Sequence, residues 1–292
     1  MCEEIKNGIS EIALTKGLQR FRTSIRNKQE EKKMKKVFAM ILALCMVFAL
    51  CAAASADKTY ELKLSTTQTD TSMIYAGMKA AADKIFEDTD GHVKVTIYPS
   101  SQLGAEEDMI DQALQGMNIA VLTDAGRLSS YVPDMGILNM AYFVNNYDDG
   151  CKVMATDTFK GWDEALAAEG LRGLCYNYYD GARSFCGHAA WTKPEDLKGV
   201  VIRTPGAAPY SKSIEALGAT AYNIGWGEVY NGIQTKAIDG CEAQFTSLVS
   251  SKIYEVCEYC SKTEHINLFN MVVCGETWFQ SLPEEDQEIV KN

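Results

Sequence analysis

Histidine is scarce in this chain of 292 residues, which contains only three, and no two of them have the spacing of metal ligands. The sequence also lacks a G-x-S-x-G turn, a Walker phosphate loop, an H-E-x-x-H helix and a glycine-rich dinucleotide fingerprint. Nucleophilic catalysis therefore has no candidate pair of residues. We expect no catalytic site, no metal and no cofactor, and we interpret His92, His188 and His265 as surface or core residues.

Positive charge is also in short supply. The chain has 28 Lys and Arg against 39 Asp and Glu, a net charge of -11. This balance argues against nucleic acid as a partner, because phosphate binding needs a basic surface. The ten cysteines are too few for a disulfide-built scaffold. With 47% apolar and 23% charged residues, the composition is globular, and the length allows two ordinary domains.

The beginning of the chain differs from the rest. An uncharged apolar run from Val37 to Ala56 follows two lysines and ends in small residues. This pattern predicts a secretory signal peptide over residues 34–56, cleaved after Ala56. A permanent membrane anchor is the alternative, because the run is just long enough to span a bilayer. A lipid anchor on Cys51 fits less well, since the bulky Leu50 precedes it.

We expect Met34 to be the true start and residues 1–33 to be an upstream extension. Residues 1–56 hold ten of the Lys and Arg and five of the Asp and Glu, which leaves a net charge of -16 on residues 57–292. Seven cysteines remain in that exported part, so at least one thiol is unpaired within a monomer.

Strand and helix patterns alternate through the exported part. The patterns predict strands near 60–64, 93–97, 118–122, 171–176 and 200–202, and helices near 74–85, 105–115, 208–217, 226–235 and 244–259. Strand–helix–strand repetition of this kind favours a mixed, mostly parallel sheet flanked by helices. We therefore expect an α/β fold of two lobes, with a ligand between them.

The C-x-x-C motif of Cys257 and Cys260 is of a type found in redox-active sites. It falls at the end of the predicted helix 244–259, whereas a helix lowers the pKa of a thiol at its N-terminus. We expect a disulfide between Cys257 and Cys260 or two buried thiols. A thiol oxidoreductase outside the cytoplasm remains the alternative.

The most specific signal runs from Gly199 to Glu242 and reads GVVIRTPGAAPYSKSIEALGATAYNIGWGEVYNGIQTKAIDGCE. It resembles the DctP-like solute-binding proteins of tripartite ATP-independent periplasmic (TRAP) transporters, with their R-x-P strand, A-L-G-A helix end, W-x-E-V-Y helix and D-G-x-E turn. Further segments match the same family along the exported part: Tyr98–Gly104, Gly181–Arg183, Lys193–Gly199, Thr263–His265 and Leu282–Glu285.

The resemblance implies a monomeric, extracytoplasmic receptor without catalysis, which closes two lobes on a small organic acid and delivers it to TRAP membrane permease subunits. It implies lobe I over residues 57–180, lobe II over 181–266, and a return to lobe I over 267–292 with the start of a C-terminal helical region that looks truncated. A sensory ligand-binding domain is another reading of such a clamshell. That reading would need a cytoplasmic module, for which the length leaves no space.

By the same resemblance, Arg203 in the R-x-P strand grips the carboxylate of the ligand, and Arg183 is a second pocket arginine. The planar guanidinium suits this role, because it binds a carboxylate with two hydrogen bonds and stays charged when buried. A structural ion pair is the alternative for Arg203. The spacing alone does not show that the two arginines converge.

Other residues are expected to shape the cleft. Trp226 either walls it or packs in the core, and Asp124 and Arg127 either line it or pair with each other on a surface turn. Thr67 and Gln68 follow the first strand, where the family places polar ligand contacts. Many relatives have Asn where this chain has Ala243, so we expect more room beside Phe245. The resemblance leaves sugar acids, dicarboxylates and aromatic acids open as ligands.

Overall fold

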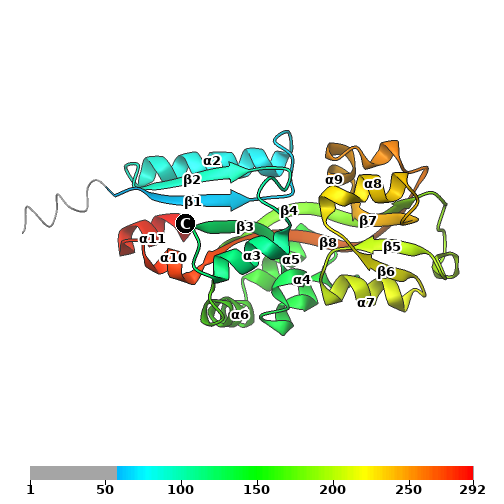
Figure 1. The fold of residues 1–292 in the computed structure, drawn as a ribbon. Coiled ribbons are helices and arrows are strands. Elements are labelled where there is room, and N and C mark those ends of the chain that lie inside the picture. Colours follow the sequence, from blue (N-terminus) through cyan, green and yellow to red (C-terminus); the bar gives the residue numbers. More distant parts are fainter. Residues whose placement is uncertain (1–57, 292) are drawn as a thin grey trace, which may run out of the picture. The chain divides into compact units, whose positions relative to one another are not determined.

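The computed structural model describes residues 58–291, and the chain from Thr59 onward forms one compact unit (Figure 1). The predicted extension 1–33, signal peptide 34–56 and lipid-anchor position Cys51 lie outside the described residues. Among the described residues, no helix has the length and apolar character needed to cross a bilayer.

The helices and strands alternate along the chain much as the sequence predicts. The strands are β1 (Tyr60–Ser65), β2 (Val93–Tyr98), β3 (Ile119–Asp124), β4 (Leu171–Gly187), β5 (Val201–Thr204), β6 (Thr220–Asn223), β7 (Gly240–Gln244) and β8 (Tyr259–Gly275). The α-helices are α2 (Met73–Asp88), α3 (Glu106–Leu114), α4 (Ala125–Leu128), α5 (Tyr147–Met154), α6 (Asp157–Ala168), α7 (Ala208–Ala216), α8 (Val229–Gln234), α9 (Phe245–Ser250), α10 (Glu276–Gln280) and α11 (Glu284–Lys291). Short 3-10 helices are η1 (Pro133–Asn139), η2 (Pro194–Leu197), η3 (Trp226–Glu228) and η4 (Ile253–Glu255).

All eight strands belong to one mixed sheet with the order β2-β1-β3-β8-β4-β7-β5-β6. We call β1, β2, β3 and the helices α2 and α3 the β1 half, and β5, β6, β7 and the helices α7 and α8 the β5 half. Within each half the strands pair in parallel, and the long antiparallel strands β4 and β8 run from one half into the other (Figure 1). The predicted α/β fold with a mixed, mostly parallel sheet is therefore confirmed.

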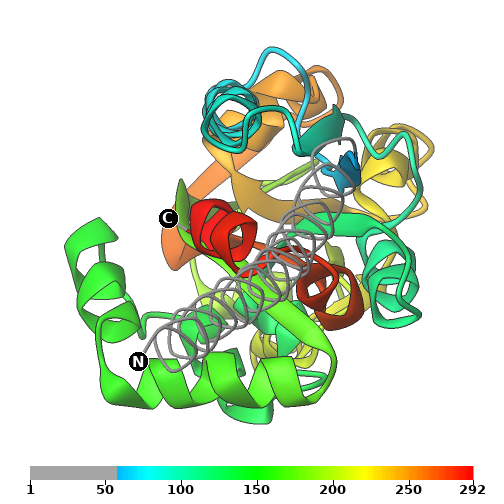
Figure 2. The ribbon, with the colours of Figure 1, turned by 90° about the vertical axis from the view of Figure 1, so that its left-hand side faces the viewer.

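The β1 half shows why these strands form. In β3 the apolar side chains alternate between two faces: Ile119 and Val121 join one core cluster, whereas Ala120 and Leu122 join another. A strand with apolar side chains on both faces is buried on both, as parallel α/β sheets require. Helices α10 and α11 lie at the end of this half in Figure 2 and contact α3 and α2, respectively.

The predicted helix over 244–259 is wrong in its second part. Helix α9 ends at Ser250, and Lys252 has a positive φ of 57°, a left-handed conformation that interrupts a helix. The chain becomes extended at Tyr259, where β8 pairs with Gly187 of β4. The pairing of two long strands thus overrides the helical pattern of this segment.

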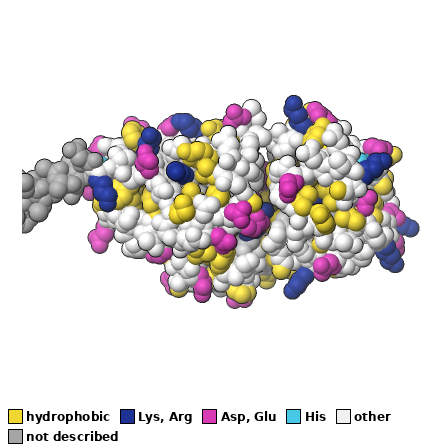
Figure 3. All heavy atoms as spheres, in the orientation of Figure 1, with side chains coloured by type: hydrophobic (Ala, Val, Ile, Leu, Met, Phe, Trp, Pro, Cys, Tyr) yellow, Lys and Arg dark blue, Asp and Glu magenta, His cyan; other side chains and the backbone are white. Residues whose placement is uncertain are grey.

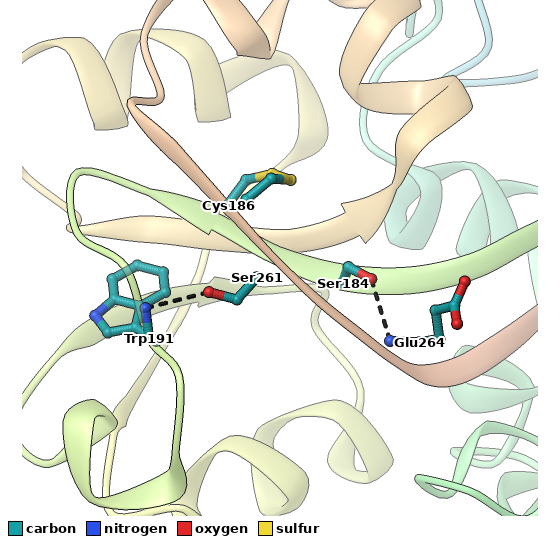
Figure 4. The surroundings of a disulfide bond; sticks show 6 residues. Ser184, Cys186, Trp191, Ser261 and Glu264 are labelled. Carbon is teal, nitrogen blue, oxygen red and sulfur yellow. Dashed lines mark hydrogen bonds between the residues drawn. A yellow bond between two sulfur atoms is a disulfide. The ribbon is translucent and has the colours of Figure 1, made fainter.

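The expected disulfide between Cys257 and Cys260 is wrong, and the pairing of β4 with β8 explains why. Cys260 bonds to Cys186 rather than to Cys257, and the two Cα atoms are 4.3 Å apart. The antiparallel register places Cys186 directly opposite Cys260, and Figure 4 shows the disulfide at Cys186. Cys257 precedes the strand and remains a free thiol. Nearby, Ser184 Oγ accepts a hydrogen bond from the backbone N–H of Glu264 at 3.1 Å, which also links β4 to β8.

Candidate ligand-binding site

Two connected cavities lie between the β1 half and the β5 half. The inner cavity has a volume of about 50 Å³ and the outer cleft about 570 Å³, and they share five lining residues: Thr67, Glu106, Arg127, Arg203 and Trp226. Several lining residues stand at or just beyond the carboxyl ends of β1, β3, β5 and β7, where ligands bind in open α/β sheets. Acidic side chains lie on both sides of the hollow between the halves in Figure 3.

Arg203 is the buried cation of this site. Its side chain is only 2% exposed, and its Nε donates a hydrogen bond to the backbone oxygen of Ile224 at 2.9 Å. The guanidinium lies over the ring of Trp226, 5.4 Å from the centroid. None of the ion pairs within residues 58–291 involves Arg203. Burial and the neighbouring Arg127 and Arg183 lower its pKa to about 10, against the opposing effect of Glu242, so it stays protonated at neutral pH.

Arg183 also lines the inner cavity, but its charge is already paired. Its Nε and Nη2 both donate to the carboxylate of Glu242, the Nη2 contact being 2.7 Å. Burial would raise the pKa of Glu242, but Arg183 and His265 hold it at about 2. The ring of Tyr210 lies 5.0 Å below the guanidinium. A buried arginine held in this way supports the wall of the cavity, and its Nη1 makes only a 3.5 Å contact with Gln244 Oε1.

Arg127 is surrounded by carboxylates. It contacts Asp124, Glu106 at 3.3 Å and Glu107 at 2.8 Å, so Asp124 and Arg127 form the ion pair that the sequence left open as an alternative. The pair is buried rather than on a surface turn, and both residues line the inner cavity. Burial lowers the pKa of Arg127, but the three carboxylates raise it well above its usual value. The single guanidinium of Arg127 thus contacts three carboxyl groups.

The excess of carboxyl groups around Arg127 affects the pKa of Glu106. Burial raises its pKa, Arg127 lowers it, and the neighbouring Asp124 and Glu107 raise it again, to about 7. The carboxyl of Glu106 therefore changes its charge near neutral pH, at a point that lines both cavities.

The remaining predicted polar and aromatic residues lie at the site as well. Trp226 lines both cavities and donates from Nε1 to Ser251 Oγ at 2.9 Å. Thr67 lines both cavities, and Gln68 lines the inner one, with its Nε2 donating to Asp180 Oδ2 at 3.1 Å. Asp180 stands where β4 passes from one half to the other, so this bond links β1 to the crossing strand.

Phe245 is the predicted site residue that the structure places elsewhere. It is 41% exposed and lines neither cavity. Because side chains alternate along β7, Cys241 and Ala243 point into the core, whereas Glu242 and Gln244 lie toward the inner cavity. The expected extra room beside Phe245 is therefore wrong, because the small residue Ala243 faces away from the site.

Two buried amides were missed by the sequence analysis. Gln244 Nε2 and Asn270 Nδ2 have no hydrogen-bond partner, and both residues line the inner cavity. A buried donor without a partner is unfavourable, which makes these groups candidates to donate to a ligand. Alternation counted from Glu242 would have indicated Gln244, but no sequence signal singles out Asn270.

A further cavity of about 610 Å³ lies away from this site. Its lining is mostly aliphatic and includes Leu62, Met78 and Val95 of the β1 half. No arginine lines it, and its two lysines, Lys84 and Lys291, pair with Asp88 and Asp163.

The C-x-x-C residues do not form a redox site in this structure. Cys260 is bonded to Cys186, and burial raises the pKa of the Cys257 thiol to about 11. A redox-active thiol needs the opposite shift, because the thiolate is the reactive form. Nothing here favours the oxidoreductase alternative.

A family model described as "Bacterial extracellular solute-binding protein, family 7" (DctP) matches residues 64–292. The chain belongs to this family. Its members are solute-binding proteins, so family membership confirms the expected binding role and extracytoplasmic location.

Named relatives agree with the family assignment. The chain is 29% identical over 246 residues to the sialic acid-binding periplasmic protein SiaP of Vibrio cholerae, covering 84% of this chain and 76% of the relative. It is 30% identical, with a TM-score of 0.77, to a TRAP periplasmic solute-binding protein of Ochrobacterium anthropi with bound L-fuconate; the match covers 80% of this chain and 77% of that one.

A third relative suggests which conformation this family member has. An apo, open structure of a TRAP solute-binding protein from Escherichia fergusonii is 32% identical over 79% of this chain and 78% of that one, but its TM-score is 0.66. The described arrangement is thus more similar to the ligand-bound relative, although the open one is slightly closer in sequence.

Proposed function

We propose that this solute-binding protein binds the carboxylate of a small organic acid with Arg203 and delivers the acid, as a monomer, to the membrane permease of a TRAP transporter. The observation that carries the proposal is a fully buried arginine at a cavity without an ion-pair partner among the described residues. Burying an unpaired charge is unfavourable, so a fold that holds one in place gains most when an anion arrives.

The inner cavity has the size of a carboxylate group. A volume of about 50 Å³ holds roughly four waters at about 10–15 Å³ each, which is similar to a carboxylate with its adjacent carbon. The donors Arg203, Gln244 and Asn270 lie around it. The rest of the ligand would then extend into the outer cleft. Sialic acid and L-fuconate, which the names of two relatives carry, are hydroxylated acids of this kind.

Binding would be coupled to closure of two lobes. We propose residues 57–180 with 267–292 as one lobe and residues 181–266 as the other, which puts the boundaries within β4 and β8. Closure around the acid would exclude water and strengthen its pairing with Arg203. In this proposal Arg183, Asp124 and Arg127 hold the walls of the cavity, and Trp226, Thr67 and Gln68 shape it.

Calorimetry with an arginine control tests the proposal. We expect Arg203→Ala to weaken binding of the best organic acid from a thermal-shift screen by about 100-fold or more, because a buried carboxylate loses its cation. Arg172→Ala is the matched control, since Arg172 pairs with Glu276 and lines neither cavity. Unchanged affinity in Arg203→Ala would remove Arg203 from the site.

A further inference from the structure

The two cavities differ in what they offer a ligand. The inner cavity presents the guanidinium of Arg203, which has no ion-pair partner among the described residues, and the amide nitrogens of Gln244 and Asn270, which have no hydrogen-bond partner. In the outer cleft, the charged lining residues that are not shared with the inner cavity are Glu107 and Glu228, and both are acids. The shared cation Arg127 is already in contact with three carboxylates.

The acids of the outer cleft are held in place. Glu107 Oε1 accepts from Arg127 Nε at 2.8 Å, and Glu228 Oε2 accepts from the backbone N–H of Gly225 at 3.2 Å. Glu107 comes from α3 in the β1 half and Glu228 from η3, next to α8 of the β5 half. Carboxylates fixed on both sides of a cleft accept hydrogen bonds from a hydroxylated chain without first having to be ordered.

We propose that Glu107 and Glu228 are specificity-determining residues, which accept hydrogen bonds from hydroxyl groups at the far end of the ligand and exclude a second carboxylate there. The inference rests on the proposed function, because it assumes that the first carboxylate lies in the inner cavity beside Arg203. It selects one of the ligand classes that the sequence leaves open. The ligand is a polyhydroxylated monocarboxylic acid, such as an aldonate, and neither a dicarboxylate nor an aromatic acid.

The proposed selectivity can be seen in two ligands that differ at a single carbon. An aldonate and the aldarate of the same stereochemistry differ only at the far carbon, which carries a hydroxymethyl group in one and a carboxylate in the other. Against fixed carboxylates the hydroxyl donates a hydrogen bond, whereas the second carboxylate can only accept and is repelled. Like charges placed together across an interface suppress the wrong partner strongly.

The test measures the affinity of the full chain for matched pairs by calorimetry: gluconate and glucarate, galactonate and galactarate, mannonate and mannarate, erythronate and meso-tartrate. We expect the best aldonate to bind at least about tenfold more tightly than its aldarate. In Glu107→Gln and Glu228→Gln this ratio should fall several-fold, because the repulsion is reduced. Glu215→Gln, an exposed change on α7 that lines neither cavity, is the control and should leave the ratio unchanged.

The outcomes separate this inference from the proposed function. Aldarates that bind as tightly as aldonates, or a ratio that both Gln variants leave unchanged, would overturn the specificity role while binding through Arg203 stands. If no member of any pair binds, the ligand is not a polyhydroxylated acid and the inference is also overturned. The comparison of Arg203→Ala with Arg172→Ala, made on the acid found in the screen, then still decides the proposed function.

Discussion

Glu106 is a site residue whose charge state should respond to a bound acid. It shares the single cation Arg127 with Asp124 and Glu107, and its pKa of about 7 places its titration at neutral pH. A ligand carboxylate beside Arg203 adds negative charge close to Glu106, which raises this pKa further. Binding should therefore be accompanied by uptake of a proton.

Uptake of a proton on binding predicts how the affinity for the acid depends on pH. Affinity for the acid should fall as the pH rises from about 6 to 8, by at most about tenfold per pH unit, because one proton is taken up. Glu106→Gln, which cannot titrate, should flatten the dependence. Calorimetry in two buffers of different ionisation heat measures the proton directly. A wild-type affinity that is constant over this range would contradict the prediction.

The raised pKa of Glu106 also makes the stability of the fold depend on pH. Its pKa in the folded protein is raised above the ordinary value of 4.5, so its contribution to stability is complete below that value. The contribution is then lost as the pH rises through about 7. The ion pair of Glu242 has the opposite dependence. Its pKa is lowered to about 2, so its contribution is lost as the pH falls toward that value.

At the scale of the elements, a buried ion pair adds to the backbone pairing of β4 with β7. Arg183 of β4 and Glu242 of β7 both lie in the interior, and removal of either leaves the other buried without its partner. We expect Arg183→Met to cost about 3–5 kcal/mol in the free energy of unfolding. The double variant Arg183→Met, Glu242→Gln should regain much of that loss, because no uncompensated charge remains. Denaturant unfolding of the single and double variants measures both values; equal losses in the two would contradict the prediction.

At the scale of the elements, some features of the site could be predicted from the sequence and others could not. The place of Arg203 at the cavity was predictable, because its R-x-P strand lies within a long, ordered family match. The partner of Arg183 was not, because Glu242 stands 59 residues away and only the pairing of β4 with β7 brings them together. The same holds for Cys186 and Cys260, which are 74 residues apart in the sequence and opposite each other across β4 and β8. Local patterns give elements, whereas strand register decides partners.

At the scale of the whole molecule, the fold predicts a measurable change of shape. The β1 half and the β5 half are joined through the crossing strands β4 and β8, and the candidate site lies between them. An acid held by both halves should favour the closed arrangement, so the radius of gyration in small-angle X-ray scattering should decrease when it is added. Arg203→Ala should show no decrease at the same acid concentration. A wild-type radius that does not respond to saturating acid would contradict closure.

The disulfide has a mechanical consequence. The bridge between Cys186 and Cys260 lies where β4 enters and β8 leaves the β5 half, so it closes β5, β6 and β7 into a covalent loop. Tension applied along the chain would pass from β4 to β8 through the two sulfur atoms. The strand that carries Arg203 would then bear none of the load, and it could keep its shape while the β1 half is being pulled apart.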